Sequence, residues 1–260
     1  MLRFSANLGF LWADRPLLER IALAAKLGFK AVEMHWPYDI APETVRNACA
    51  AHSVAMLGIN TVRGDVSRGE NGLGALPGRE AEFQAAIDQS IAWGRVAGAT
   101  AIHAMAGIVR PTDQAEATAT FTENLREAAD KAADAGMILL LEPLNPRAST
   151  GYFYSTLARA AEMIVRVGKP NVKIMFDVHH VGVSEGDVLT KFERYLPMIG
   201  HIQFAAVPSR AEPDEGEIDF RAIFAAIEKS SYSGWVGAEY RPRTTVEAGI
   251  GWVETLGVKL

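Results

Sequence analysis

Short apolar runs alternate with longer amphipathic segments along the whole chain. The short runs are rich in Ile, Leu and Val, which is typical of parallel strands buried on both faces. We expect strands at 3–8, 31–35, 54–60, 101–105, 137–142, 172–177, 199–204 and 234–240. We expect helices at 16–27, 42–51, 78–97, 113–135, 153–167, 187–195, 219–229 and 244–256. Eight strand–helix units in succession predict a closed α/β barrel.

The length of 260 residues agrees with one such domain, since TIM barrels run to about 250 residues. We therefore predict a single TIM (β/α)8 barrel over residues 1–260. An open doubly wound sheet could be built from the same units, but it binds ligands at a switch point of the strand order. The count of eight and the placement of polar residues favour the barrel. The polar, Gly-rich segment 61–77 is expected to be a loop over the C-terminal face and a candidate substrate lid.

Four polar residues close four consecutive strand-like runs in the second half of the chain. Glu142 ends MILLLE, Asp177 ends VKIMFD, Gln203 lies in IGHIQF, and Glu239 ends GWVGAE. In a TIM barrel the C-terminal ends of the strands form the active site. Three carboxylates brought together there need a cation, protons or basic side chains. Their all-oxygen donor set predicts a site for Mg²⁺ or Mn²⁺.

An alternative is that these acids cap helices or pair with nearby basic residues. Lys173, Arg210 and Arg241 are the candidates for such pairs. Ion-pair networks also place acids in clefts, so either interpretation could apply to one acid taken alone. The convergence of all four polar residues favours the metal site.

Composition narrows the classes of partner and compartment. The formal net charge is -5 and no Lys/Arg run is long enough to follow a phosphate backbone, so we expect no nucleic-acid partner. No apolar run approaches the roughly 20 residues of a membrane span. The N-terminal residues lack a signal-peptide pattern, and the single cysteine, Cys49, suits a reducing compartment. We therefore expect a cytoplasmic protein.

Several short motifs, taken together in their order and spacing, resemble the hydroxypyruvate isomerase family. They are RFSANL, YD at 38–39, PGRE at 77–80, EP-x-N at 142–145, D-x-x-H at 177–180, GHIQ at 200–203, GEI at 216–218 and GWVGAEYRP at 234–242. That family belongs to the xylose-isomerase-like TIM barrels. The resemblance extends from the first strand to about residue 252 and implies the same fold.

The resemblance also implies roles for named residues. Glu142, Asp177, Gln203 and Glu239 would bind the metal, and Glu142 and Glu239 would also exchange protons with the substrate. His180 and Arg210 would orient the substrate's oxygens, with Arg210 as the expected partner of its carboxylate.

The implied reaction is the conversion of hydroxypyruvate to tartronate semialdehyde through an enediolate. Isomerisation of a 2-oxo-tetronate and 3-epimerisation of a ketose are the enzymatic alternatives. A non-catalytic barrel that binds a sugar acid is a further alternative, which the pair of candidate proton-transfer groups disfavours. The partner is in each case a small hydroxy-carbonyl compound, and a homo-oligomer would suit a barrel.

The histidines separate into those near the predicted site and those below it. His180, three residues after Asp177, could donate a hydrogen bond to a substrate oxygen, whereas His179 is expected to point elsewhere. His201 shares a strand face with Gln203 but should lie one layer deeper in the barrel. Glu33 and His35 share a face of the second strand and are candidates for shaping the pocket.

Overall fold

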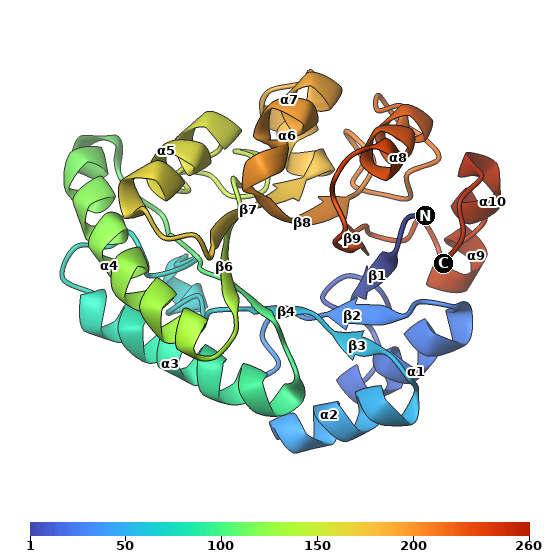
Figure 1. Cartoon of the computed structure of the whole chain (residues 1–260), viewed down its shortest axis with the longest axis horizontal. Coiled ribbons are helices and arrows are strands. Elements are labelled where there is room, and N and C mark those ends of the chain that lie inside the picture. Colours follow the sequence, from blue (N-terminus) through green and yellow to red (C-terminus); the bar gives the residue numbers. More distant parts are fainter.

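Nine parallel strands surround a common axis in the computed structural model, which describes all 260 residues, and helices cover their outer side (Figure 1). The sheet order is β3-β2-β1-β9-β8-β7-β6-β5-β4. The strands are β1 (Phe4–Asn7), β2 (Ala31–Glu33), β3 (Ala55–Met56), β4 (Gly58–Asn60), β5 (Ala101–His103), β6 (Ile138–Leu141), β7 (Val172–Asp177), β8 (Ile199–Phe204) and β9 (Val236–Ala238).

The two ends of this sheet, β3 and β4, are separated in the chain by Leu57 alone. The Leu57 amide donates to the carbonyl of Val32 at 2.9 Å, and the Met34 amide donates to the carbonyl of Gly58 at 3.0 Å. The β2 segment therefore pairs with both β3 and β4, and the barrel closes around eight strand positions. The predicted strand 54–60 is thus observed as two short strands, β3 and β4, which together occupy one of the eight places in the barrel. The predicted TIM barrel is therefore confirmed.

Helices follow the strands in the expected alternation. They are α1 (Leu17–Leu27), α2 (Pro42–Ala51), α3 (Glu80–Ala97), α4 (Gln114–Asp134), α5 (Leu157–Val167), α6 (Val178–Ser184), α7 (Val188–Tyr195), α8 (Phe220–Lys229), α9 (Val246–Gly249) and α10 (Trp252–Leu256), with short 3₁₀ turns η1 (Val66–Arg68), η2 (Pro111–Asp113) and η3 (Leu196–Met198). None of these helices is long and apolar enough to cross a membrane.

Two helices differ from the sequence-based expectation. The helix predicted at 244–256 is divided into α9 and α10, because Gly249 and Gly251 weaken it at the junction. The short helix α6 was not predicted, since Val178, Val181 and Val183 favour an extended chain. It begins directly after β7, where the Asp177 carboxylate accepts from the backbone amide of His179 at 2.8 Å and caps the helix.

One continuous hydrophobic cluster of 64 buried residues forms the core between the strands and the helices. Aromatic rings fasten the C-terminal helix α10 to the barrel. The Trp252 ring packs edge-on against the rings of Phe4 and Phe204, with distances between ring centres of 5.5 Å and 5.3 Å. Such pairs contribute about 0.5–1.5 kcal/mol each beyond their buried area. The C-terminal helix thus packs against the barrel beside β1, near the N-terminus (Figure 1).

The barrel interior changes in character along its axis. In the interior of the barrel, Ala101, Leu140 and Met175 form a small apolar cluster beside a cavity of about 210 Å³. At the C-terminal ends the side chains are polar and buried, among them Asn7, Glu33 and Gln203. The polar layer is therefore held rigidly by strand ends, which suits a site whose geometry must be exact to a few tenths of an ångström.

The loop between β4 and α3 lies across this polar end. Its Gly72 forms a bridge with Ala106, and the Gly74 amide donates to the carbonyl of Met105 at 3.1 Å. The guanidinium of Arg63 lies 3.9 Å from the ring centre of Trp36. The expected position of the 61–77 loop is thus observed, while its role as a lid stays a prediction.

Candidate functional site

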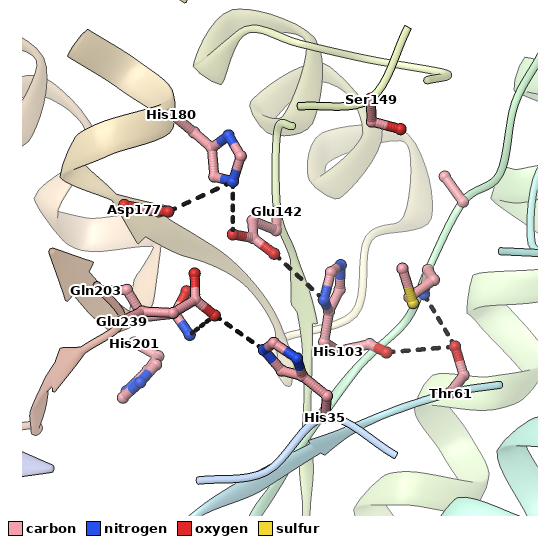
Figure 2. A network of polar contacts seen from close by, with 12 residues as sticks. His35, Thr61, His103, Glu142, Ser149, Asp177, His180, His201, Gln203 and Glu239 are labelled. Atoms are coloured by element: carbon pink, nitrogen blue, oxygen red, sulfur yellow. Dashed lines mark hydrogen bonds and ion pairs between the residues drawn. The ribbon is translucent and has the colours of Figure 1, made fainter. Parts of the chain in front are cut away.

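Four neighbouring strands deliver the predicted site residues to one place at the C-terminal end of the barrel (Figure 2). Glu142 and Glu239 follow directly after β6 and β9, and Asp177 and Gln203 lie at the ends of β7 and β8. Their exposed fractions are 5%, 4%, 1% and 2%, respectively. Ligand atoms of Glu142, Asp177, Glu239 and His180 all lie within 4.8 Å of one another. The predicted residues are therefore neighbours in space, and His180 joins them.

Three acceptor oxygens in this cluster are buried without any hydrogen-bond partner. They are Oε1 of Glu142, Oδ2 of Asp177 and Oε1 of Gln203. A buried oxygen without a partner is costly, and more so when it carries charge. A hard divalent cation would satisfy all three at once, because Mg²⁺ and Mn²⁺ prefer oxygen ligands. The residues present therefore fit a divalent metal ion.

The orientation of the Gln203 amide follows from its contacts beneath the cluster. Its Nε2 donates to Oε2 of Glu33 at 2.8 Å and lies 3.3 Å from Oε1 of Glu239. Because both neighbours are acceptors, the nitrogen must face them and the oxygen is left for the site. Glu33 is itself held by Nε2 of His201 at 3.0 Å and by the Ser5 hydroxyl at 2.9 Å.

Glu33 and His201 form a buried ion pair. Burial opposes the charge of Glu33, but His201, together with hydrogen bonds from Gln203 and Ser5, outweighs it, so its pKa is lowered. Burial likewise opposes the charge of His201, and Glu33 raises the pKa of the imidazole above its usual value. His201 thus lies one layer below the site, as its position on the strand predicted, and acts on Gln203 through Glu33.

Glu239 is surrounded by donors. Its Oε1 accepts from Nδ2 of Asn7 at 2.7 Å and lies 3.1 Å from Nε2 of His35, and its Oε2 accepts from Nη2 of Arg210 at 2.5 Å. Burial opposes ionisation, but Arg210 and His35 outweigh it, so the pKa of Glu239 is lowered. Glu239 is therefore held as a carboxylate.

Arg210 also lies 3.6 Å from Oδ2 of Asp177. Of the three basic residues considered as partners for the acids, it alone forms ion pairs with them. Neither Lys173 nor Arg241 makes an ion pair with any of the site carboxylates. The alternative of a purely structural ion-pair network thus accounts for Glu239 and in part for Asp177, but not for Glu142.

Glu142 has the opposite environment. Burial, together with the charges of Glu239 and Asp177, raises its pKa well above the usual value. Its Oε2 lies 3.3 Å from Nδ1 of His103. Burial lowers the pKa of His103 to about 3, so this imidazole is neutral near pH 7 and cannot offset the charge of Glu142. A bound cation would supply that missing positive charge.

His180 is fixed in one tautomer. Its Nδ1 accepts from the backbone amide of Asn145 at 2.9 Å and lies 2.8 Å from Nδ2 of the same residue. In the neutral ring the proton must then be on Nε2, which lies 3.4 Å from Oδ2 of Asp177 and 3.6 Å from Oε1 of Glu142. Burial lowers the pKa of His180 to about 3. In this tautomer His180 is a hydrogen-bond donor in the site, and Nη1 of Arg210 lies 3.4 Å from the same Nε2.

Sequence reasoning missed the roles of Asn7 and Asn145. Both lie in segments that carried the family resemblance, but a lone asparagine after a strand gives no further signal. His35, a candidate for shaping the pocket, contacts Glu239 directly. His179 does point elsewhere, since its Nδ1 lies 2.8 Å from the carbonyl oxygen of Ala206.

A cavity of about 330 Å³ opens from the cluster towards the surrounding loops. Glu142, Glu239, His180, Gln203 and Arg210 lie in its wall. Further from the cluster, the wall is formed by residues of four loops: Trp36, Asn71, Leu144, Arg147, Ser149 and Arg241. A small polar molecule in this cavity could therefore reach both carboxylates that were predicted to exchange protons.

A barrel of this kind, with a buried oxygen-rich cluster at the strand ends, matches a known family. The model of the xylose isomerase-like TIM barrel matches residues 21–256. The chain therefore belongs to the xylose isomerase-like TIM barrel family.

Individual relatives narrow the class further. The chain is 41% identical to the 2-oxo-tetronate isomerase of Cupriavidus necator, over 98% of each chain. It is 37% identical to the hydroxypyruvate isomerase of Escherichia coli, over 98% of this chain and 99% of that one. It also matches a solved structure described as an AP endonuclease, family 2, from Brucella melitensis, with a TM-score of 0.95, 38% identity and coverage of 98% and 99%. The chain is thus an enzyme of the isomerase class, of the type that the family resemblance implied.

Proposed function

We propose that this enzyme isomerises hydroxypyruvate to tartronate semialdehyde with the help of Mg²⁺ or Mn²⁺. The observation that carries the proposal is the meeting of two buried carboxylates, Glu142 and Glu239, with the unpartnered oxygens of Asp177 and Gln203. Proton transfer needs the carboxylates, and a chelated substrate needs the cation. The relatives named hydroxypyruvate isomerase and 2-oxo-tetronate isomerase support the same reaction type.

Glu142, Asp177, Gln203 and Glu239 would hold the metal ion. When bound, such an ion polarises the substrate carbonyl and stabilises the negative charge that develops on neighbouring oxygens. The pairing of Gln203 with Glu33 supports this assignment, because it turns the amide oxygen towards the cluster.

The reaction moves one proton between adjacent carbons. A carboxylate takes a proton from C3 of hydroxypyruvate, which leaves an enediolate shared by C2 and C3. A carboxylic acid then returns a proton to C2. The proton of the C3 hydroxyl group passes to the C2 oxygen, so the C3 oxygen becomes the aldehyde oxygen and the C2 oxygen becomes a hydroxyl group. Glu142 and Glu239 are the groups proposed for the two carbon-bound protons, and positioned acid–base catalysis of this kind contributes about 10²–10⁴-fold.

His180 and Arg210 are proposed to orient the substrate. The Nε2–H of His180 faces the space between Asp177 and Glu142, where it can donate to a substrate oxygen. Arg210 holds Glu239 through Nη2, so it keeps this carboxylate ionised and aimed at the cavity. His180 is buried and Arg210 is largely enclosed, and both lie among acids.

A 2-oxo-tetronate is the second candidate substrate. The 41% identity to a 2-oxo-tetronate isomerase favours it, and the chemistry is the same with one more carbon. Ketose 3-epimerisation is not favoured by the relatives that are most similar in sequence. A mere sugar-acid binder is not favoured either, since binding alone does not require two proton-transfer groups.

The remaining proposals concern partners and organisation. We propose that residues 1–260 form one domain that acts on a small molecule and not on nucleic acid. The net charge of -5 supports this, because DNA-binding surfaces are strongly basic. A homo-oligomer would suit the exposed helices of the barrel.

Proton NMR in D₂O tests the proposed reaction directly. Protein loaded with Mn²⁺ or Mg²⁺, and protein stripped with EDTA, are incubated with hydroxypyruvate. We expect metal-dependent tartronate semialdehyde with deuterium at C2. No turnover by the metal-loaded protein would reject this substrate, and the same assay with a 2-oxo-tetronate and with ketohexoses would then identify the reaction.

A further inference from the structure

We propose that Arg147 and Ser149 form an anion subsite at the mouth of the cavity, which holds the carboxylate of the substrate. The inference rests on the proposed function, and it names a recognition site in addition to Arg210, which was the expected partner of this carboxylate. Both residues lie in the loop after β6 and line the same cavity as Glu142 and Glu239. In Figure 2, Ser149 lies above Glu142, whereas His201 lies below it.

The loop that carries Arg147 is a turn stabilised by several hydrogen bonds. Asn145 is buried, and its backbone carbonyl accepts from the amides of Ala148 and Ser149, each at 3.0 Å. Its side-chain oxygen accepts from the Ala148 amide at 2.9 Å. Asn145 is also the residue that fixes the ring of His180. The backbone at Arg147 is therefore held in place by the same asparagine that sets the tautomer in the reaction site.

The side chain of Arg147 has no hydrogen-bond or ion-pair partner within the chain. It is exposed at the cavity mouth. Ser149 beside it is buried, and its Oγ accepts from Nδ2 of Asn71 at 3.0 Å, so its own hydroxyl proton is free to be donated. A guanidinium and a hydroxyl group that both lack an acceptor match the two oxygens of a carboxylate.

Charge balance explains why Arg210 does not fill this role alone. Asp177, Glu142 and Glu239 carry three negative charges when ionised. A divalent cation and Arg210, which already bonds to Glu239, offset them. The charges of Arg147 and Arg241 in the cavity wall are then left over, and a focused positive potential at a cleft mouth attracts anions. A substrate with a carboxylate is attracted by this positive potential and binds more tightly, whereas a neutral ketose is not. Of these two residues, only Arg147 shares its loop with the free hydroxyl donor of Ser149.

Affinity measurements with two inert anions isolate this subsite. Tartronate can chelate the metal through its hydroxyl group and one carboxylate and still present a second carboxylate, whereas glycolate has no second carboxylate. Binding of each to the Mn²⁺-loaded protein is measured by calorimetry for the wild type, Arg147→Met, Ser149→Ala and two controls. Arg241→Met removes the same charge elsewhere in the cavity wall, where Arg241 lies 5.6 Å from the ring centre of Phe10. Arg46→Met removes it from the exposed side of α2.

We expect Arg147→Met to weaken tartronate binding by about 10- to 100-fold and glycolate binding by no more than about threefold, as for loss of a charge-assisted hydrogen bond. Ser149→Ala should act in the same direction by a few-fold. Arg241→Met should weaken both anions equally and only at low salt, and Arg46→Met should change neither. Equal losses for both anions in Arg147→Met, or equal effects of Arg147→Met and Arg241→Met, would overturn the subsite. The proposed reaction fails separately, if the wild type does not turn over hydroxypyruvate.

Discussion

The side-chain amide of Gln203 donates from Nε2 to Oε2 of Glu33 over 2.8 Å, and this contact leaves Oε1 of Gln203 facing the carboxylate cluster without a partner. Glu33, which lies beneath the carboxylate cluster, thus determines which atom of Gln203 faces that cluster. Partners of metal ligands commonly affect metal affinity about 10- to 100-fold.

Replacement of Glu33 by Gln should therefore weaken Mn²⁺ binding by about 10- to 100-fold, because a neutral amide can no longer hold the Gln203 nitrogen in one orientation. Mn²⁺ affinity is measured by electron paramagnetic resonance, with circular dichroism to verify folding. Ser5→Ala serves as the matched control, since Ser5 contacts the other oxygen of Glu33 and should cost only a few-fold. Wild-type affinity in Glu33→Gln would contradict a metal-ligand role for Gln203.

A side chain at position 237 should destabilise the protein. A Cβ at this position would lie 2.1 Å from Oε1 of Glu33, so Gly237→Ala must displace the buried carboxylate. We expect a loss of about 1–3 kcal/mol in the free energy of unfolding, measured by urea denaturation, together with weaker Mn²⁺ binding. Gly251→Ala is the control, since nothing lies within 4 Å of its added Cβ. Unchanged stability and metal affinity in Gly237→Ala would show that the Glu33 arrangement is not needed.

Substitution of either proposed proton-transfer group should stop turnover. Glu142→Gln and Glu239→Gln should each lower kcat by about 10²–10⁴-fold. Because both residues would also hold the metal, Mn²⁺ occupancy is verified at the protein concentration of the assay. Glu254→Gln, on the exposed surface of α10, controls for loss of charge. If a fully loaded Glu239→Gln protein kept turnover within tenfold of wild type, the proton-transfer scheme would be wrong.

His180 should be observed as the Nε2–H tautomer. Its Nδ1 faces the donating amide of Asn145, and burial lowers its pKa to about 3, so no titration is expected between pH 5 and pH 8. Nitrogen-15 NMR of labelled histidines in the metal-free protein measures both properties, with His180→Asn assigning the signals. A protonated Nδ1, or a titration near pH 6.5, would refute the proposed donor role.

The metal-free protein should lose stability as the pH falls below about 6.5, and part of this loss should depend on His103. Its pKa in the folded state is about 3, because of burial, against about 6.5 in the unfolded chain. Below pH 6.5 the unfolded chain binds a proton that the folded chain does not, so this contribution is complete above pH 6.5 and is lost as the pH falls towards 3. His103→Gln should therefore show a shallower decline between pH 6 and pH 4, by about one proton. Urea denaturation in EDTA measures this, and identical slopes would contradict the neutral buried state.

The secondary structure could be predicted because it depends on local pattern, and the closed barrel because eight strand–helix units follow one another. A strand that is buried on both faces must be apolar throughout, and a helix that covers it must be amphipathic, so both periods appear in the sequence. Helix α6 and the break between α9 and α10 escaped prediction. In both places the outcome depends on a cap or on glycines at a junction, which compete with the general pattern.

The sequence by itself determined that Glu142, Asp177, Gln203 and Glu239 end consecutive strands, because strand ends follow from the hydrophobic pattern and parallel strands in a barrel end on one face. Only the tertiary structure decided how these residues differ from one another. Arg210 reaches Glu239 from a distant loop, Glu33 turns the Gln203 amide, and Asn145 sets the proton on His180. These contacts join residues far apart in the chain, and their charges and hydrogen bonds depend on burial and distance, which arise only when the barrel closes.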